Sequence, residues 1–341
     1  MAEATQVTDL ADLRRDLLHR VRDATGATAT NNIADRYLNT ALHDMHLDPG
    51  HNWPWAIRRA YILTHAPYTT GTVSITAAAR TTVTGSSTLW NTAVTGMGFN
   101  NARAGGKMTF SGSLEVYEVS TVDSDTQITL TNRWSGDALS AASYAYYEDE
   151  YALVSDFLRP VDTRNFSLSN QIHLIGDREF YRRHPRNSTR SKPREATIIQ
   201  LAFSGATTPR LRVVFSPAPD DEYEIPYRYI TSNLAGDSTG AEKTQLTATT
   251  DEPIVPLYCR HAIVFHALYH WYRDRKDDKR SQEAKAEYVD IMGRIAGTVL
   301  HGASDRPRFA PNYGRYLGRR YGGGRYEGDD KWFDELRDRN Y

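Results

Sequence analysis

Two histidines four residues apart are the residues in this sequence whose type and spacing come closest to a metal site. His266 and His270 lie in the apolar segment "AIVFHALYHWY", and side chains at this spacing share one face of a helix. Two such imidazoles can bind a transition metal, but the intervening "ALY" lacks the glutamate that acts as general base in metalloproteases. We therefore expect these histidines to be packed within a helix, without a metal.

Two further groups of ionisable residues lack a spacing suited to catalysis. His43, His46 and His51 cluster loosely at the end of a predicted helix, where the helix dipole favours a protonated imidazole. The run "EDE" from Glu148 to Glu150 offers adjacent carboxylates, but neighbours on a strand point to opposite faces. These groups therefore predict neither a metal site nor an acid–base pair.

Nucleotide binding and covalent catalysis also lack candidate residues. The glycine-rich stretches "GMGFNN" and "GRRYGGG" neither follow a buried strand nor open an amphipathic helix, and the sequence has no Gly-Lys-Ser/Thr motif. The single cysteine, Cys259, lies in an apolar helical segment, and no serine elbow occurs. We expect a protein that is not an enzyme and has no catalytic residue, no metal and no cofactor.

Composition limits the remaining classes of function. The 341 residues are enough for two or three domains, each with its own core. The net charge of -1, from 41 basic and 42 acidic residues, argues against a protein whose whole surface coats nucleic acid or a membrane. One cysteine allows no intrachain disulfide, and the segment after Met1 lacks a secretory pattern, so we expect folding in a reducing cytoplasm. The most apolar run is too short to span a membrane.

Positive charge is instead concentrated in two segments, of which the first runs from Arg178 to Arg194. It carries seven basic residues against one acid and lies between predicted strands. It is either a solvated turn or a loop that faces an anion, namely DNA or an acidic neighbouring protein. Its basic residues are Arg178, Arg182, Arg183, Arg186, Arg190, Lys192 and Arg194.

The second basic segment belongs to a tail from Ser304 to Tyr341, which we expect to extend away from the body of the protein. Its stretch from Arg306 to Tyr326 holds six arginines, five aromatic residues and no acid, and its last part is acidic around an apolar cluster. Arginine, tyrosine and tryptophan dominate interface energies, so we expect the tail to dock in a protein groove; a disordered linker is the alternative. The candidate docking residues are Arg306, Arg308, Phe309, Tyr313, Arg315, Tyr316, Arg319, Arg320, Tyr321, Arg325, Tyr326, Trp332 and Phe333.

Hydrophobic periodicity predicts the elements that position these residues. Apolar residues at three- and four-residue spacing predict two helices near each chain end, whereas alternation predicts strands between them. We predict an α+β fold: a helical bundle from both chain ends, a central β region with an inserted small β domain, and an extended C-terminal tail. The predicted boundaries are 1–66 for the N-terminal helices, 67–150 for the inserted domain, 151–250 for the second β region, 251–303 for the helical hairpin and 304–341 for the tail. Within the second β region we expect strands near 171–175, 197–203, 211–215 and 223–230.

The order of several segments is similar to that in a known family. "NNIADRYLNTALHDM" is followed by "NWPWAIRRAYILTHAP", "GTVSITAAARTTVTGSSTLWN" and "YEVSTVDSDTQITL". Near the C-terminus, "VVFSPAPDDEYEIPYRY" looks like a final β-hairpin, and "VPLYCRHAIVFHALYHWYRDRKDDKRSQEAKAEYVDIMGRI" looks like a closing helical hairpin. This arrangement resembles the head-to-tail adaptor (connector) proteins of tailed double-stranded DNA bacteriophages, the tail-tubular-protein-A-like group.

The resemblance implies a structural protein of the virion neck, assembled in the host cytoplasm. Such a protein forms a ring, usually of twelve copies, between the portal protein and a tail tube or nozzle protein. Genomic DNA passes through the centre of the ring, and no membrane is involved. The C-terminal extension, here residues 304–341, would grip the portal.

Two other functions remain open from the sequence. The chain could bind nucleic acid without sequence preference, through the segment from Arg178 to Arg194 and the Arg/Tyr-rich tail. It could also be a carbohydrate-binding virion component if Trp90 and Trp134 are exposed on the inserted β domain. Salt sensitivity separates the first alternative from an adaptor, because DNA binding through phosphate contacts weakens steeply with ionic strength.

Overall fold

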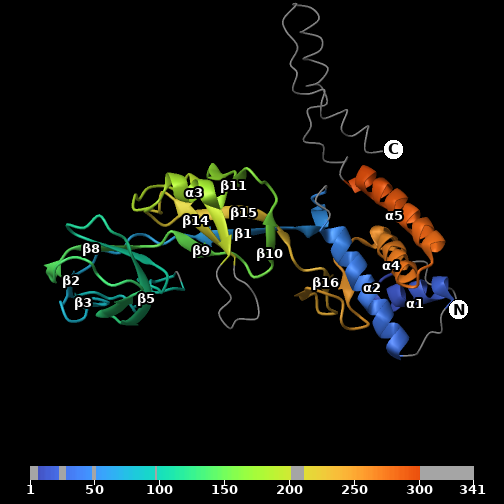
Figure 1. Ribbon diagram of the computed structural model, residues 1–341, viewed down its shortest axis with the longest axis horizontal. Helices are drawn as coiled ribbons and strands as arrows, with labels where there is room; N and C mark the ends of the chain where they lie inside the picture. Colours follow the sequence, from blue (N-terminus) through green and yellow to red (C-terminus); the bar gives the residue numbers. More distant parts are fainter. Residues whose placement is uncertain (1–6, 23–27, 48–50, 97, 201–210, 300–341) are drawn as a thin grey trace, which may run out of the picture. The chain divides into compact units, whose positions relative to one another are not determined.

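A computed structural model describes residues 7–22, 28–47, 51–96, 98–200 and 211–299 of the chain (Figure 1). The chain divides into two compact units. The helical unit comprises the described residues within Met1–Pro54 and Pro256–Tyr341, and the β unit comprises those within Trp55–Val255. Each unit is described by itself below.

The helical unit contains four of the five α-helices of the described residues. Helix α4 contacts α1, α2 and α5, and α1 also contacts α2. Leu10, Leu17, Leu38 and Trp271 are among its fully buried side chains, so three of these helices contribute to the core. The bounds are α1 Leu10–Val21, α2 Thr28–His46, α4 His261–Asp274 and α5 Asp278–Val299, with a short 3-10 helix η2 at Leu257–Cys259.

Helix α4 is buried on several sides because it carries apolar residues around most of its circumference. Seven of its residues are buried, among them His270 and Trp271. Helix α5 follows α4 directly and packs against it (Figure 1). The helix expected around His266 and His270 is confirmed.

The β unit contains a seven-stranded antiparallel sheet that curls on itself, in the order β7-β2-β3-β6-β5-β4-β8. Its core is aromatic: Trp90, Trp134 and Tyr146 are buried within it. The ring nitrogen of Trp90 donates to the hydroxyl of Tyr144 at 2.9 Å. Because Trp90 and Trp134 are core residues, the carbohydrate-binding hypothesis that relied on their exposure is wrong. The strands are β2 Thr72–Ile75, β3 Thr82–Ser86, β4 Lys107–Phe110, β5 Tyr117–Ser124, β6 Gln127–Leu130, β7 Leu139–Ala142 and β8 Tyr144–Tyr147.

Three smaller sheets complete the β unit, in the orders β11-β12-β13-β14-β9, β1-β15-β10 and β17-β16-β18. Only β12 and β13 pair in parallel; every other strand pair of the described residues is antiparallel. The strands are β1 Ile57–Leu63, β9 Glu150–Ala152, β10 Phe157–Pro160, β11 Asn165–Ser167, β12 Ile172–Leu174, β13 Glu195–Gln200, β14 Leu211–Ser216, β15 Glu224–Thr231, β16 Ala235–Gly236, β17 Glu242–Lys243 and β18 Glu252–Pro253. The unit also holds the 3-10 helix η1 at Pro54–Ala56 and helix α3 at Asp177–Arg183.

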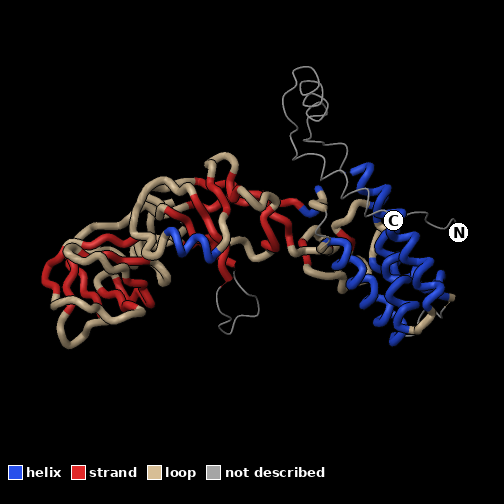
Figure 2. Tube along the Cα trace, turned by 45° about the horizontal axis from the view of Figure 1, so that its top comes forward, coloured by secondary structure: helices blue, strands red, loops and turns tan. Residues whose placement is uncertain are grey.

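The predicted fold class is wrong. The described chain is mostly β, with eighteen strands in four sheets, and it is not a bundle of helices from both chain ends (Figure 2). The prediction missed part of the seven-stranded sheet because β4, β7 and β8 have only four residues each, too few for a clear alternation. The expected final β-hairpin is also wrong, since β14 and β15 belong to different sheets.

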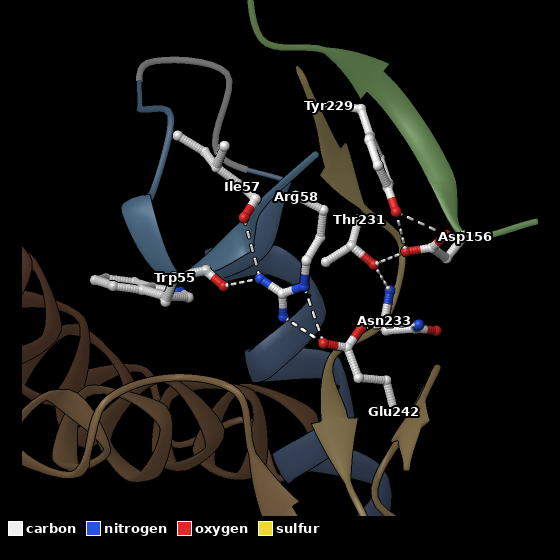
Figure 3. A network of polar contacts seen from close by, with 8 residues as sticks. All are labelled: Trp55, Ile57, Arg58, Asp156, Tyr229, Thr231, Asn233 and Glu242. Atoms are coloured by element: carbon white, nitrogen blue, oxygen red, sulfur yellow. Dashed lines mark hydrogen bonds and ion pairs between the residues drawn. The ribbon is translucent and has the colours of Figure 1, made fainter. Parts of the chain in front are cut away.

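A chain of polar contacts links strands of two sheets of the β unit (Figure 3). The Asp156 carboxylate accepts hydrogen bonds from the Tyr229 hydroxyl, at 2.9 and 3.0 Å, and from the Thr231 hydroxyl, at 2.7 Å. Arg58 donates to Glu242 at 2.5 and 2.9 Å. The backbone amide of Asn233 donates to the Thr231 hydroxyl at 3.1 Å and its side-chain amide donates to Glu242 at 3.2 Å, so these contacts connect β1, β15 and the residue preceding β10 with β17.

Candidate functional site

Three side chains of the helical unit bring their polar atoms to one point. His266 and His270 lie one turn apart on α4, and Asp44 lies near the end of α2. The Oδ2 atom of Asp44 is 3.0 Å from Nε2 of His266 and 3.1 Å from Nε2 of His270. The two Nε2 atoms are 3.2 Å apart. We call Asp44, His266 and His270 the His–Asp cluster.

Packing between α2 and α4 positions the His–Asp cluster. Tyr37 donates its hydroxyl to Asp274 at 2.7 Å and its ring meets Trp271 edge-on. Asp44 follows Tyr37 by seven residues, which is about two turns of α2. It contacts residues of α4 that come earlier in the chain than those that Tyr37 contacts. The two helices therefore run antiparallel, and both contacts lie on the same face of α2.

The surroundings of the cluster hold the imidazoles in place and leave the carboxylate accessible. The side chains of His266 and His270 are 13% and 8% exposed, whereas that of Asp44 is 43% exposed. The ring of Tyr288, from α5, lies 4.3 Å from that of His266, centroid to centroid. Burial lowers the pKa of His266, although the Asp44 carboxylate acts in the opposite direction. The neutral imidazole is therefore favoured.

The sequence predicted packed histidines without a metal, and it missed Asp44. The structure confirms that both histidines lie in a helix, but it brings their nitrogens together on a carboxylate, a set of ligand types that proteins use for metals. The signal that could have found Asp44 is its spacing from Tyr37, because residues seven apart share a helical face. The partner helix could not have been identified from this spacing alone.

The other histidines singled out in the sequence do not join the cluster as ligands. His43 is exposed and its Nδ1 is 3.9 Å from Oδ1 of Asp44. His46 is buried, and the ring of His51 stacks on that of Trp53 at 4.9 Å. The expected loose cluster of His43, His46 and His51 therefore does not converge on one point.

The adjacent carboxylates Glu148 to Glu150 have separate structural partners. Glu148 is 4% exposed, binds Arg103 and accepts a hydrogen bond from the Tyr146 hydroxyl at 2.6 Å. Asp149 is fully buried and pairs with Lys107 at 2.6 Å. Burial, followed by the nearby charge of Asp149, raises the pKa of Glu150. Glu148 and Asp149 thus have different partners, whereas Lys107 also lies 3.8 Å from Glu150.

The segment from Arg178 to Arg194 begins with helix α3, which the sequence analysis missed. Only Phe180 of α3 is buried, so the helix shows little hydrophobic period. Arg182 and Arg183 each bind Glu179 at 2.7 Å, within the helix. Arg183 also binds Glu195 of β13 at 2.9 Å. Part of the positive charge is therefore neutralised inside the segment.

The remaining cations of this segment fall into two groups. Arg186 lies 3.5 Å from Glu115, and the guanidinium of Arg190 lies 5.6 Å from the centre of the Tyr147 ring. Arg178, Lys192 and Arg194 are exposed and form no ion pair among the described residues. A loop that faces an anion stays a prediction, and these three side chains are its best candidates.

Comparison of the sequence with protein families and with curated proteins found no match. In the part of the chain that the structure describes, no helix has the length and apolar character needed to cross a membrane. The predicted docking residues of the tail, from Arg306 to Phe333, lie outside the described residues.

Proposed function

We propose that this chain is a structural assembly protein, the head-to-tail adaptor that its sequence resembles. Copies of the chain form a ring between the portal and a tail tube or nozzle protein, in the neck of the virion, and DNA passes through the centre. The chain performs no chemical step in this role. Assembly takes place in the host cytoplasm and involves no membrane.

The observation that carries this proposal is the exposure of large apolar side chains on both units. Leu114 of the β unit is 83% exposed and Tyr258 of the helical unit is 68% exposed. Tyr61, Leu168 and Val289 are further examples, each more than half exposed. A ring subunit needs two different surfaces that bind each other in the next copy, and exposed apolar side chains on separate units suit that requirement.

The helical hairpin of α4 and α5 also supports the proposal, because the resemblance implies such a closing hairpin. The two helices are consecutive and in contact. The absence of the expected final β-hairpin removes one part of the resemblance, since β14 and β15 lie in separate sheets. The proposal therefore relies on the helical hairpin and on the exposed apolar residues.

Non-specific nucleic-acid binding is the weaker alternative. Four of the seven cations between Arg178 and Arg194 already have an acidic or aromatic partner within the chain. In an adaptor, Arg178, Lys192 and Arg194 would instead face passing DNA or an acidic neighbour without providing the main binding energy.

The test of the proposal is co-sedimentation of the purified chain with capsids that carry a portal but lack this protein. We expect saturable binding that survives a rise in salt from low to physiological concentration, because apolar contacts are not screened. Capsids without a portal are the control and should not bind. Binding to free DNA alone, lost steeply as salt rises, would favour the alternative.

A further inference from the structure

We propose that the His–Asp cluster binds one divalent first-row transition ion, for which Zn²⁺ is the fitting species. The site joins α2 to α4 through Asp44, His266 and His270. It goes beyond the proposed function and does not depend on it.

The separations between the three ligand atoms are slightly shorter than those around a tetrahedral zinc ion. Zinc binds nitrogen and oxygen ligands at about 2.0–2.2 Å in a tetrahedron, which places the ligand atoms about 3.3–3.5 Å from one another. The Asp44–His266, Asp44–His270 and His266–His270 separations are 3.0, 3.1 and 3.2 Å. The three atoms already form one face of such a tetrahedron, and small side-chain adjustments complete the fit.

Hydrogen bonds can satisfy at most two sides of this triangle of atoms at once. A neutral imidazole carries one proton on its two nitrogens. If both Nε2 atoms are protonated, Asp44 accepts two hydrogen bonds, but the two N–H groups of His266 and His270 oppose each other across 3.2 Å. If one Nε2 is bare, its lone pair opposes that of the Asp44 carboxylate at 3.0 or 3.1 Å. One cation between the three atoms is attracted to all of them.

The ligand types select the class of ion. Imidazole nitrogen suits zinc, copper, iron and nickel, whereas magnesium and calcium require oxygen ligands. Two imidazoles and one carboxylate are a recurrent zinc-binding set when a further position is filled by water. Asp44 is 43% exposed, so water can reach the ion on the side of the carboxylate.

Other charged and polar groups near the site limit its affinity. Arg273, on α4, carries a positive charge close enough to disfavour protonation of His266, and it also opposes a bound cation. The Nδ1 atom of His266 is buried and has no hydrogen-bond partner among the described residues. A metal-bound imidazole normally donates through its second nitrogen, and loss of such a partner weakens metal binding by about 10–100-fold. We therefore expect weaker binding than at a fully supported zinc site.

Binding of the ion would fasten two helices that come from distant parts of the chain. A ligand that binds only the folded state stabilises it by an amount that grows with the logarithm of the ratio of free ligand concentration to dissociation constant, so the unfolding temperature rises as ligand is added. The role of the site is thus to stabilise the contact between α2 and α4, and no chemical step is assigned to it.

The test is equilibrium dialysis of the full chain, freed of metal with a chelator, against Zn²⁺. We expect one zinc per chain and an unfolding temperature that keeps rising with the logarithm of the free zinc concentration, also above the concentration that fills the site. Asp44→Asn, His266→Gln and His270→Gln should each weaken binding at least about 10-fold. His19→Gln, an exposed histidine on α1, is the matched control and should bind as the unmodified chain does.

Asp44→Asn is the decisive variant because this side chain is half exposed and its substitution leaves the histidine packing intact. Circular dichroism verifies that each variant is folded. The absorption spectrum of bound Co²⁺ provides a second readout on the unmodified chain, and we expect the bands of a tetrahedral site. No saturable binding of one ion per chain, or equal affinity in Asp44→Asn, would overturn the proposal.

Discussion

The side chain of Asp149 has no exposed surface, so neighbouring groups of the β unit must compensate its negative charge. Lys107 lies 2.6 Å from its Oδ2 atom, and the side-chain amide of Asn187 donates to the same oxygen at 2.6 Å. Replacing one partner of a buried ion pair leaves the other charge without compensation. We predict that Lys107→Met lowers the free energy of unfolding by about 3 kcal/mol or more.

Urea denaturation at neutral pH measures this change. Lys192→Met is the matched control, because Lys192 is exposed and forms no ion pair among the described residues. A surface substitution of this kind changes stability by less than about 0.5 kcal/mol. Equal losses in the free energy of unfolding in the two variants would show that the Lys107 ammonium group does not compensate the charge of Asp149.

Asp251 is the carboxylate whose charge is most strongly stabilised by hydrogen bonds in the β unit. Its buried side chain accepts from the amides of Thr247 and Ala248, both at 2.8 Å, and from the ammonium of Lys243 at 2.9 Å. Burial alone would raise the pKa of Asp251, but the Ala248 amide, Lys243 and Thr247 together lower it well below its ordinary value. We predict that Asp251→Asn destabilises the protein by about 2 kcal/mol at neutral pH.

The sign of the pH dependence follows from the lowered pKa of Asp251. The stabilisation is fully present above the unfolded pKa of about 3.9 and is lost as pH falls below it toward the folded pKa. The difference between the unmodified chain and Asp251→Asn should therefore be constant above about pH 5 and shrink below about pH 4. Denaturation series at several pH values measure it, and a difference that grows on acidification would contradict the assignment.

At the scale of elements, Asp156 fastens the start of β10 to β15. Its carboxylate is the shared acceptor of the Tyr229 and Thr231 hydroxyls, so Asp156→Ala removes the acceptor of both hydrogen bonds (Figure 3). We predict a loss of about 2–3 kcal/mol in the free energy of unfolding.

The pKa of Tyr229 gives an independent readout of the same contact. Burial, then the hydrogen bond to Asp156, raises the pKa of Tyr229 above its ordinary value. We expect Asp156→Ala to lower it, as measured by ultraviolet titration of the tyrosines. Asp290→Ala, at an exposed ion pair on α5, is the control. An unchanged titration together with unchanged stability would show that this contact does not hold β10.

Local elements could be predicted from the sequence where their pattern was long enough. Strands were expected near 171–175, 197–203, 211–215 and 223–230, and the structure places β12, β13, β14 and β15 there. Helix α3 escaped prediction because its seven residues bury only Phe180. Strands β4, β7 and β8 escaped it for the same physical reason, since four residues contain few alternations.

Pairing between elements could not be predicted, because it depends on contacts between residues distant in the sequence. Strands β14 and β15 follow each other in the sequence as the strands of a hairpin do, yet each pairs in a different sheet. Likewise, the spacing of His266 and His270 predicted a shared helical face, but nothing in the sequence indicated that Asp44 of α2 would lie opposite them. The fold class was wrong for this reason, and the candidate site was found only in part.

At the scale of the whole molecule, the proposal assigns portal binding to the tail from Ser304 to Tyr341. Ordering a flexible segment costs on the order of 1 kcal/mol per residue, so aromatic anchors must fill pockets in the partner. We predict that deletion of residues 304–341 leaves a folded chain that no longer co-sediments with portal-bearing capsids. Trp332→Ala with Phe333→Ala should weaken binding in part, whereas Trp332→Phe should weaken it less. Undiminished binding of the truncated chain would assign docking to the rest of the molecule.

The central claim, that this chain is an adaptor between portal and tail, is tested most directly by cryo-electron microscopy of portal-bearing capsids mixed with the purified chain. The account predicts a ring of density at the portal vertex alone, with rotational symmetry, a central opening for DNA and the helical and β units of each copy recognisable within it. Capsids without added density at that vertex, or density spread along released DNA, would contradict the claim.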